Sequence, residues 1–238
     1  RSNNLSSVKD VIKTTMRDRQ LMIFSATIND ETLKVAKDLM KEPKIIKIEE
    51  ESLVNPNIYH MYFTVEQRDK IELLRKLIAS INPERAIVFI NKNEETQLTT
   101  LKLQHHHIKA YGIFGNASKE ERKKALEGFR NGKIQILVAS DLAARGLDVK
   151  DVTHIFNLDL PEDSKEYLHR VGRTGRAGKT GTAISLVTMR EKSIISKYEK
   201  NFEITIEPKE IHRGIIMDPK ASRPSFRANK SPNFNRKR

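Results

Sequence analysis

The sequence predicts the α/β class, with a parallel sheet flanked by helices on both faces in a three-layer sandwich. Strand-like and helix-like segments alternate along most of the 238 residues. That order is typical of parallel strands joined by right-handed crossovers. The runs at residues 86–90 and 134–139 are almost wholly apolar, as strands buried within a sheet are.

The first fifty residues predict a short αβ segment that ends at a domain boundary. Residues 21–24 are an apolar run that predicts a buried strand, and residues 30–40 carry apolar side chains at helical spacing. Residues 45–48 predict a further strand. Three glutamates at 49–51 and the Asn-Pro-Asn sequence at 55–57 then break the pattern. We therefore expect one domain to end at residue 48 and the next to start at residue 49.

Beyond the boundary, strands and helices alternate up to about residue 187. Strands are predicted at residues 59–65, 86–90, 108–113, 134–139, 152–158 and 182–187. Helices are predicted at 71–81, at about 94–104, from Ser118 to about Phe129, and from Asp163 through Arg170. Ser118 with Glu121 three residues later is a capping-box signature. Ligand sites in such sheets lie beyond the carboxyl ends of the strands.

The net charge of +13 is concentrated near the C-terminus. Residues 209–238 contain nine Lys or Arg and two Asp or Glu, with three prolines and few large apolar side chains. This composition predicts a basic, flexible tail. Arginine and phenylalanine alternate in it, which suits RNA phosphates and base stacking. A solvated terminus that only aids solubility is the alternative.

Composition also excludes several classes of protein. There is no cysteine, so disulfides, thiolate zinc sites and thiol nucleophiles are absent. No apolar run approaches the roughly 20 residues that span a bilayer. The first residues lack the character of a signal peptide. We therefore expect a cytoplasmic protein with no membrane partner.

The most informative segment is residues 169–176, His-Arg-Val-Gly-Arg-Thr-Gly-Arg. Arg173 and Arg176 are three residues apart with a glycine between them, and their planar guanidinium groups match phosphate oxygens. For an isolated arginine pair, a surface ion-pair turn would be the better interpretation. Two further segments favour the phosphate site: Ser-Ala-Thr at 25–27 and Ala-Ser-Asp-Leu-Ala-Ala-Arg-Gly-Leu-Asp at 139–148.

These three segments resemble the third, fifth and sixth motifs of the DEAD-box RNA helicases, in the family's order. The resemblance covers about residues 19–205 and implies a RecA-like fold. It implies that residues 1–48 are the C-terminal remnant of the ATP-binding domain and that residues 49–208 are the second RecA-like domain. The sequence has no Gly-x-x-x-x-Gly-Lys-Ser/Thr loop and no Asp-Glu-Ala-Asp segment. In the family both belong to the first domain, so we expect a fragment.

The resemblance implies roles for residues on the nucleotide side. Arg173 and Arg176 are the expected catalytic residues, arginine fingers that reach across to ATP and Mg²⁺ held by the N-terminal RecA-like domain. Asp148 is expected to contact the ribose, with an ion pair to a nearby basic group as the alternative. Gly146 permits close approach of the backbone.

The resemblance also implies RNA-binding residues at the ends of other strands. Asn91 matches the fourth motif, Gly115 follows another strand, Arg122 matches the arginine of a Gln-x-x-Arg element, and Ser140 stands where the family has threonine. Lys119 replaces the glutamine of that element and leaves the role of this position open. Such residues contact the backbone of RNA and carry little base information.

Ser25, Thr27 and His169 are expected to couple hydrolysis to unwinding across the domain interface. For Ser25 and Thr27 considered apart from the other motifs, capping of the helix from residue 30 is the better interpretation. Residues 105–107 are three adjacent histidines, whose side chains point in different directions. No metal site is expected there.

The leading hypothesis is an ATP-dependent RNA helicase that unwinds or remodels RNA by ATP-driven domain closure. This chain would supply the second domain and would be inactive without the first. The alternatives are a noncatalytic RNA-binding scaffold and a DNA-acting translocase with the same core. Residues 1–48, without their sheet, are expected to be flexible, to refold onto the second domain, or to pair between chains.

Overall fold

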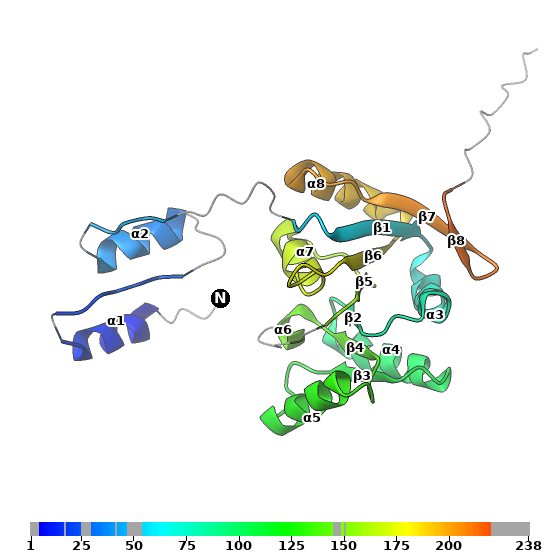
Figure 1. Cartoon of the computed structure of the whole chain (residues 1–238), viewed down its shortest axis with the longest axis horizontal. Helices are drawn as coiled ribbons and strands as arrows, with labels where there is room; N and C mark the ends of the chain where they lie inside the picture. The colour runs from blue at the N-terminus through cyan, green and yellow to red at the C-terminus, as the bar shows by residue number, and fades with distance from the viewer. Residues whose placement is uncertain are drawn as a thin grey trace, which may run out of the picture. The chain divides into compact units, whose positions relative to one another are not determined.

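The computed structural model describes residues 5–16, 18–24, 30–40, 42–46, 54–144, 149 and 151–219. The chain divides into two compact units, residues 1–50 and residues 51–238 (Figure 1). The predicted domain boundary lies two residues before this division.

The described residues of the first unit form two helices, α1 (Leu5–Thr14) and α2 (Asp30–Leu39). Helix α2 lies where the apolar spacing predicted a helix, whereas α1 was not anticipated. Residues 21–24 form no strand, so that expectation was wrong. A strand requires a hydrogen-bonded neighbour, and the described residues of this unit include none. Met22 and Phe24 are accordingly 64% and 87% exposed.

The second unit is built on a sheet in the order β3-β4-β2-β5-β6-β1-β7-β8 (Figure 1). The neighbours from β3 through β7 in this order are parallel, and β8 is antiparallel to β7. The bounds are β1 Ile58–Thr64, β2 Ala86–Phe89, β3 Ala110–Ile113, β4 Ile136–Ala139, β5 His154–Asn157, β6 Gly181–Val187, β7 Glu207–His212 and β8 Ile215–Met217. All six strands predicted in this unit are present.

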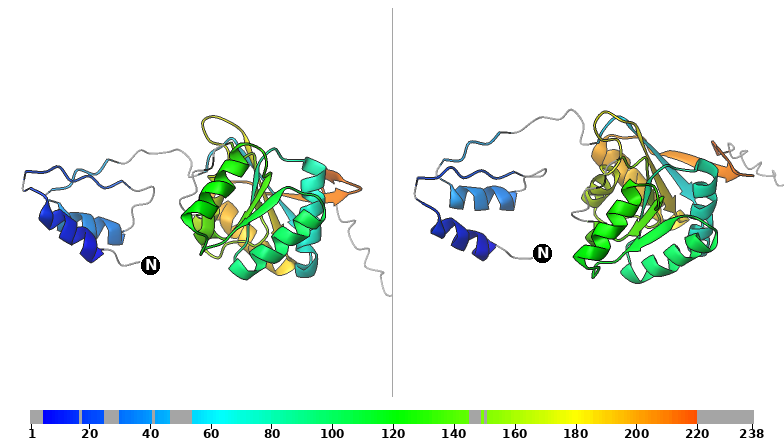
Figure 2. Two further views of the ribbon diagram at one scale, coloured as in Figure 1. Left: turned by 90° about the horizontal axis from the view of Figure 1, so that it is seen from below. Right: turned by 60° about the horizontal axis from the view of Figure 1, so that its bottom comes forward.

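Helices cover both faces of this sheet, which confirms the three-layer sandwich (Figure 2). Helices α3 (Lys70–Ile81) and α4 (Asn93–His105) pack on one face, where Val88 of β2 contributes to their core. Ile87, the residue before Val88 in β2, belongs to the opposite face of the sheet, where it packs with α5 (Lys119–Arg130). That face is completed by α6 (Asp141–Ala144), α7 (Ser164–Val171) and α8 (Lys192–Phe202).

The signals that start α5 and α7 operate as the sequence predicts. The Ser118 hydroxyl accepts a hydrogen bond from Glu121 N (3.1 Å), and the Glu121 carboxylate accepts one from Ser118 N (2.8 Å). This closes the capping box. At α7, the carboxylate of Asp163 accepts a hydrogen bond from Lys165 N (2.9 Å). The N-termini of both helices are therefore fixed, close to Arg122 in α5 and one helix length before His169 and Arg170 in α7.

The β7–β8 hairpin corrects the predicted start of the tail. Residues 209–217 belong to the sheet and not to a flexible tail, because β7 pairs with β1 and the side chains of Ile211 and Ile216 pack against the core. Arg213 and Gly214 both have positive φ, 49° and 79°, as two-residue hairpin turns require. Helix α8 was also not anticipated. Residues 220–238 lie outside the described residues.

A buried histidine beside α7 makes the stability of this unit depend on pH. His60 is 4% exposed, its Nδ1 lies 2.8 Å from the Tyr167 hydroxyl, and burial lowers the pKa of His60 to about 4. Between pH 6.5 and 4 the unfolded chain therefore binds a proton that the folded chain does not. We therefore expect stability to fall as the pH falls through this window, by on the order of 2 kcal/mol at pH 5. Burial also lowers the pKa of His154, with the same sign.

Urea unfolding at pH 7 and pH 5 tests this prediction. The wild-type chain should lose more stability between these two pH values than the His60→Gln variant, which keeps a hydrogen-bonding side chain without a titration. An equal loss in the two proteins would show that His60 does not carry the effect.

Candidate functional site

Three of the predicted RNA-binding residues follow neighbouring parallel strands at the same edge of the sheet. Asn91 follows β2, Gly115 follows β3 and Ser140 follows β4, and these three strands lie side by side. The carboxyl ends of parallel strands meet at one edge, where ligands bind in open α/β sheets. The fold therefore brings the residues together although they are up to 49 positions apart in the chain.

Asn93, the first residue of α4, connects two of these strand ends. Its Oδ1 accepts hydrogen bonds from the Ser140 hydroxyl (3.5 Å) and from Gly115 N (3.4 Å). The Arg122 guanidinium donates to Gly115 O (3.4 Å) and to Ala143 O (3.1 Å). Gly115, Arg122 and Ser140 thus form one cluster. Sequence reasoning missed Asn93, and its position two residues after the fourth-motif asparagine was the available signal.

Asn91, in contrast to these three residues, is used inside the protein. Its Nδ2 donates to Leu160 O (2.9 Å), and its Oδ1 accepts from Arg170 Nη2 (2.8 Å). Its backbone N–H donates to Asp159 Oδ2 (3.1 Å). Because both ends of the amide have protein partners, its side chain positions Arg170 here.

Among the residues that the structure describes, Arg170 is the largest fully buried side chain, 1% exposed, and the sequence analysis gave it no role. It forms a bidentate ion pair with Asp141, with Nε–Oδ1 and Nη2–Oδ2 distances of 2.7 and 2.6 Å. Its guanidinium carbon lies 5.1 Å from the centroid of the Phe89 ring. The other acceptors are Asn91 Oδ1, Asp159 O (2.6 Å) and Asn157 Oδ1 (3.4 Å). A buried guanidinium is stable only when its donors are satisfied in this way.

The candidate catalytic arginines follow Arg170 at the end of α7. Arg173 is half-buried, and its backbone N–H donates to Arg170 O (3.1 Å). Burial, and then the neighbouring charge of Arg176, lower the pKa of the Arg173 guanidinium. Arg176 is exposed, with Nε donating to Gly172 O (2.8 Å). Two cations placed this close together favour an anion that neutralises both.

His169 lies at the same small cavity as Arg173. Both line a small cavity of about 40 Å³ together with Asp141, Ala144 and Arg170. The sixth-motif segment and the start of α6 are therefore in contact. The other predicted residues, Ser25, Thr27, Gly146 and Asp148, lie outside the described residues.

Helix α4 ends at His105, the first of the three adjacent histidines, and this end lies away from these clusters. The rings of His105 and His106 meet edge to face, with centroids 5.2 Å apart. Within the described ranges, no group of three or more His, Asp or Glu side chains is arranged to hold a metal ion.

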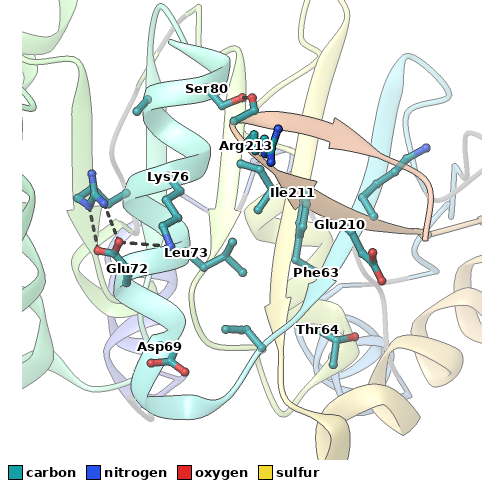
Figure 3. Close-up of a pocket in the computed structure, with 15 residues that line it drawn as sticks. Phe63, Thr64, Asp69, Glu72, Leu73, Lys76, Ser80, Glu210, Ile211 and Arg213 are labelled. Carbon is teal, nitrogen blue, oxygen red and sulfur yellow. Dashed lines mark hydrogen bonds and ion pairs between the residues drawn. The ribbon is translucent and has the colours of Figure 1, made fainter. Parts of the chain in front are cut away.

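A wide groove of about 950 Å³ lies between α3 and the β7–β8 hairpin (Figure 3). Phe63, Leu73 and Ile211 contribute apolar side chains, and Glu72, Lys76 and Arg213 contribute charges. None of the predicted site residues lines it. The candidate site is therefore the polar edge of the sheet and not this groove.

Comparison with known proteins identifies the class first. Residues 69–178 match the family model described as the helicase conserved C-terminal domain. The DEAD-box protein SrmB of Escherichia coli, in its crystal structure with the regulator of ribonuclease activity A, has 35% sequence identity and a TM-score of 0.62. The match covers 71% of this chain and 98% of that one. The fold is thus RecA-like, as predicted.

The chain belongs to the DEAD-box family of RNA helicases. It is 38% identical over 236 residues to the DEAD-box ATP-dependent RNA helicase CshC of Bacillus cereus, covering 96% of this chain and 59% of that protein. It is 38% identical over 200 residues to the probable ATP-dependent RNA helicase YfmL of Bacillus subtilis, covering 84% and 53%. The chain thus spans little more than half the length of these relatives.

A solved structure of a further family member holds both kinds of ligand. Dbp5 of Saccharomyces cerevisiae bound to RNA and ADP BeF3 has a TM-score of 0.77 and 26% identity, over 87% of this chain and 56% of that one.

Among the helices that the structure describes, none is long and apolar enough to cross a membrane.

Proposed function

We propose that this chain supplies the second RecA-like domain of an ATP-dependent RNA helicase. The observation that carries the proposal is the link between two clusters. Gly115, Arg122 and Ser140 form the first cluster, and Arg173 and Arg176 form the second. Asp141, next to Ser140, is paired with Arg170. Arg170 lies one helical turn before Arg173. The residues proposed to bind RNA and those proposed to bind the nucleotide are therefore joined by the Arg170–Asp141 ion pair, in which the Arg170 side chain is buried.

The first cluster suits the backbone of a single strand of RNA. It offers a hydroxyl, a guanidinium and the backbone of a glycine, all of which are groups that bind phosphate and sugar. Binding without sequence preference follows. The Dbp5 structure with RNA and ADP BeF3 supports this assignment of ligands.

The second cluster suits the terminal phosphates of ATP. Arg173 and Arg176 supply positive charge where negative charge develops in phosphoryl transfer. Bound ATP with Mg²⁺ would supply the scissile phosphoanhydride and a neutralising metal. We assign the magnesium mainly to the N-terminal RecA-like domain, as the resemblance to the family implies. Gly146 and Asp148 remain the predicted contacts to the nucleotide.

Residues 1–48 are proposed to complete that N-terminal domain, with Ser25, Thr27 and His169 as coupling residues. The exposed apolar side chains of Met22, Ile23 and Phe24 support this, because partner strands would cover them. Self-association through the same side chains is the alternative. Location in the cytoplasm stays a prediction.

ATP hydrolysis by the full-length protein tests the proposal. We expect hydrolysis to be slow without nucleic acid, to rise strongly with single-stranded RNA, and to rise little with DNA of matched sequence. Stimulation by DNA alone would favour a translocase. No hydrolysis with either nucleic acid, together with RNA binding, would favour the scaffold.

The basic tail is proposed to tether RNA. Since β8 ends at Met217, the truncation should remove residues 220–238 and keep the hairpin. These residues carry seven Lys or Arg and no acid. Removing them should weaken RNA binding and reduce the slope of log K against log salt by up to about 5. An affinity and a slope equal to those of the full chain would refute the tether.

A further inference from the structure

Lys70 is a buried cation that belongs to none of the motifs. It is the first residue of α3, and its side chain is 2% exposed. Lysine is almost never fully buried unless it is paired. Its Nζ lies 3.1 Å from Glu191 Oε2 and 3.7 Å from Asp159 Oδ1. The burial is therefore compensated by two carboxylates from distant parts of the chain.

Glu191 is held in place independently of Lys70. Its Oε2 accepts a hydrogen bond from Thr188 N (2.7 Å), which caps the short 3-10 helix Met189–Glu191. Burial by itself would raise the pKa of Glu191, but the Thr188 N–H and the charge of Lys70 outweigh it and lower the pKa. The carboxylate is thus ionised at neutral pH and anchors one side of Lys70.

Asp159 connects Lys70 to the candidate site. Its Oδ1 faces Lys70, its Oδ2 accepts from Asn91 N (3.1 Å), and its backbone carbonyl accepts from Arg170 Nη1 (2.6 Å). Asn91 in turn accepts from Arg170 Nη2 (2.8 Å). A shift of Asp159 would therefore move the Arg170 guanidinium by two routes. One is the direct hydrogen bond to the Asp159 carbonyl, and the other passes through Asn91.

The connection passes from one face of the sheet to the other. Helix α3 packs on one face and α7 on the other, and Asp159 lies at the strand edge between them. We propose that Lys70 is a positioning residue: it acts through Asp159 to orient Arg170, and through Arg170 it orients Asp141 beside Ser140. The kinetic consequence of this positioning rests on the function proposed above.

A purely structural role makes a different prediction. A buried ion pair adds little net stability, and removing one partner is costly mainly because the other charge is left uncompensated. If Lys70 only stabilised the fold, removing its charge together with that of Glu191 would restore normal behaviour. If Lys70 positions Arg170, the double variant would remain impaired, because Asp159 would still lack its cationic partner.

The test compares two double variants of the full-length protein. Lys70→Met with Glu191→Gln removes the pair but keeps a carbonyl oxygen for Thr188 N. The control, Lys76→Met with Glu72→Gln, removes partly exposed ion pairs on the same helix, where Glu72 lies 3.5 Å from Lys76 Nζ and 2.6 Å from Arg75 Nη2 (Figure 3). At saturating ATP and RNA, we expect the first variant to lower kcat roughly 10- to 100-fold. The control should change kcat less than twofold.

A second readout is independent of helicase activity. In NMR spectra of the 238-residue chain, the Arg170 Nε–H signal should shift and exchange faster with water in the Lys70→Met/Glu191→Gln variant, and stay unchanged in the control. If the wild-type protein hydrolyses no ATP but the signal changes, the proposed function fails and the positioning role stands. An unchanged signal with an unchanged kcat would overturn the positioning role.

Asp159→Asn tests the same connection if the Lys70 variants do not fold. It leaves Lys70 paired with Glu191 and removes only the charge through which Lys70 acts. The same loss of kcat and the same change in the Arg170 signal are expected. Wild-type behaviour of a folded Asp159→Asn protein would contradict the proposal.

Discussion

Replacing Arg173 or Arg176 by Ala in the full-length protein is expected to lower RNA-stimulated ATP turnover by roughly 10³- to 10⁵-fold. An arginine supplied to a phosphoryl-transfer site stabilises charge that develops only in the transition state. Arg173 is already partly desolvated beside Arg176, so its interaction with a phosphate is screened less than that of an exposed arginine. Turnover is measured at saturating RNA and ATP.

The binding of RNA without nucleotide should stay nearly intact in both variants. This separates the arginine fingers from the cluster of Gly115, Arg122 and Ser140. Arg68→Ala is the matched control, because the Arg68 side chain is 86% exposed and pairs only loosely with Asp69 at 3.7 Å. Wild-type turnover in the Arg173 and Arg176 variants would end their assignment as catalytic residues.

Replacing Arg170 by Met is expected to destabilise the second unit by about 3–5 kcal/mol. The substitution leaves the Asp141 carboxylate and several buried acceptors without their partner, and desolvated groups of this kind are costly. Arg170→Met with Asp141→Leu should recover much of the stability, since an apolar pair of similar volume replaces the buried ions. Urea unfolding of the 238-residue chain measures both effects.

The same pair of variants separates stability from function. The double variant should fold but should not recover RNA-stimulated turnover in the full-length protein, because the link between Ser140 and Arg173 is gone. A loss of less than about 1 kcal/mol in Arg170→Met would contradict the structural role of the ion pair. Full turnover in the double variant would contradict the link.

Local periodicity was enough to predict the parallel core of the second unit. The runs at 86–90 and 134–139 became β2 and β4, and the Ser118–Glu121 box begins α5. These signals are read from neighbouring residues and do not depend on distant contacts. The same reasoning failed at residues 21–24, because an apolar run forms a strand only where another strand pairs with it.

The hairpin at 207–217 was misjudged for a different reason. This segment has the charge expected of a solvated tail, because it contains Lys209, Glu210 and Arg213. Its packing against the core is indicated only by two apolar side chains, Ile211 and Ile216. In the hairpin Ile211 and Ile216 pack against the core and Glu210 is exposed, whereas the Lys209 side chain is only 15% exposed and is paired with Glu207 and Asp218. An edge strand of this kind is visible only once its neighbour is known.

The candidate site was predictable as a set of residues but not as a network. The motifs indicated Ser140, Arg173 and their neighbours through resemblance, and the parallel strands explain why they gather at one edge. No pattern showed that Arg170 would be buried against Asp141, because their pairing joins positions 29 residues apart. The protein partners of the Asn91 amide could not be predicted for the same reason, since they are all distant in sequence.

The most direct test of the account is a structure of the full-length protein with RNA and a nonhydrolysable analogue of ATP. The account predicts that the Arg173 and Arg176 guanidinium groups both lie about 3 Å from oxygens of the terminal phosphoryl group. It is contradicted if, in that closed complex, both guanidinium groups face solvent away from the nucleotide.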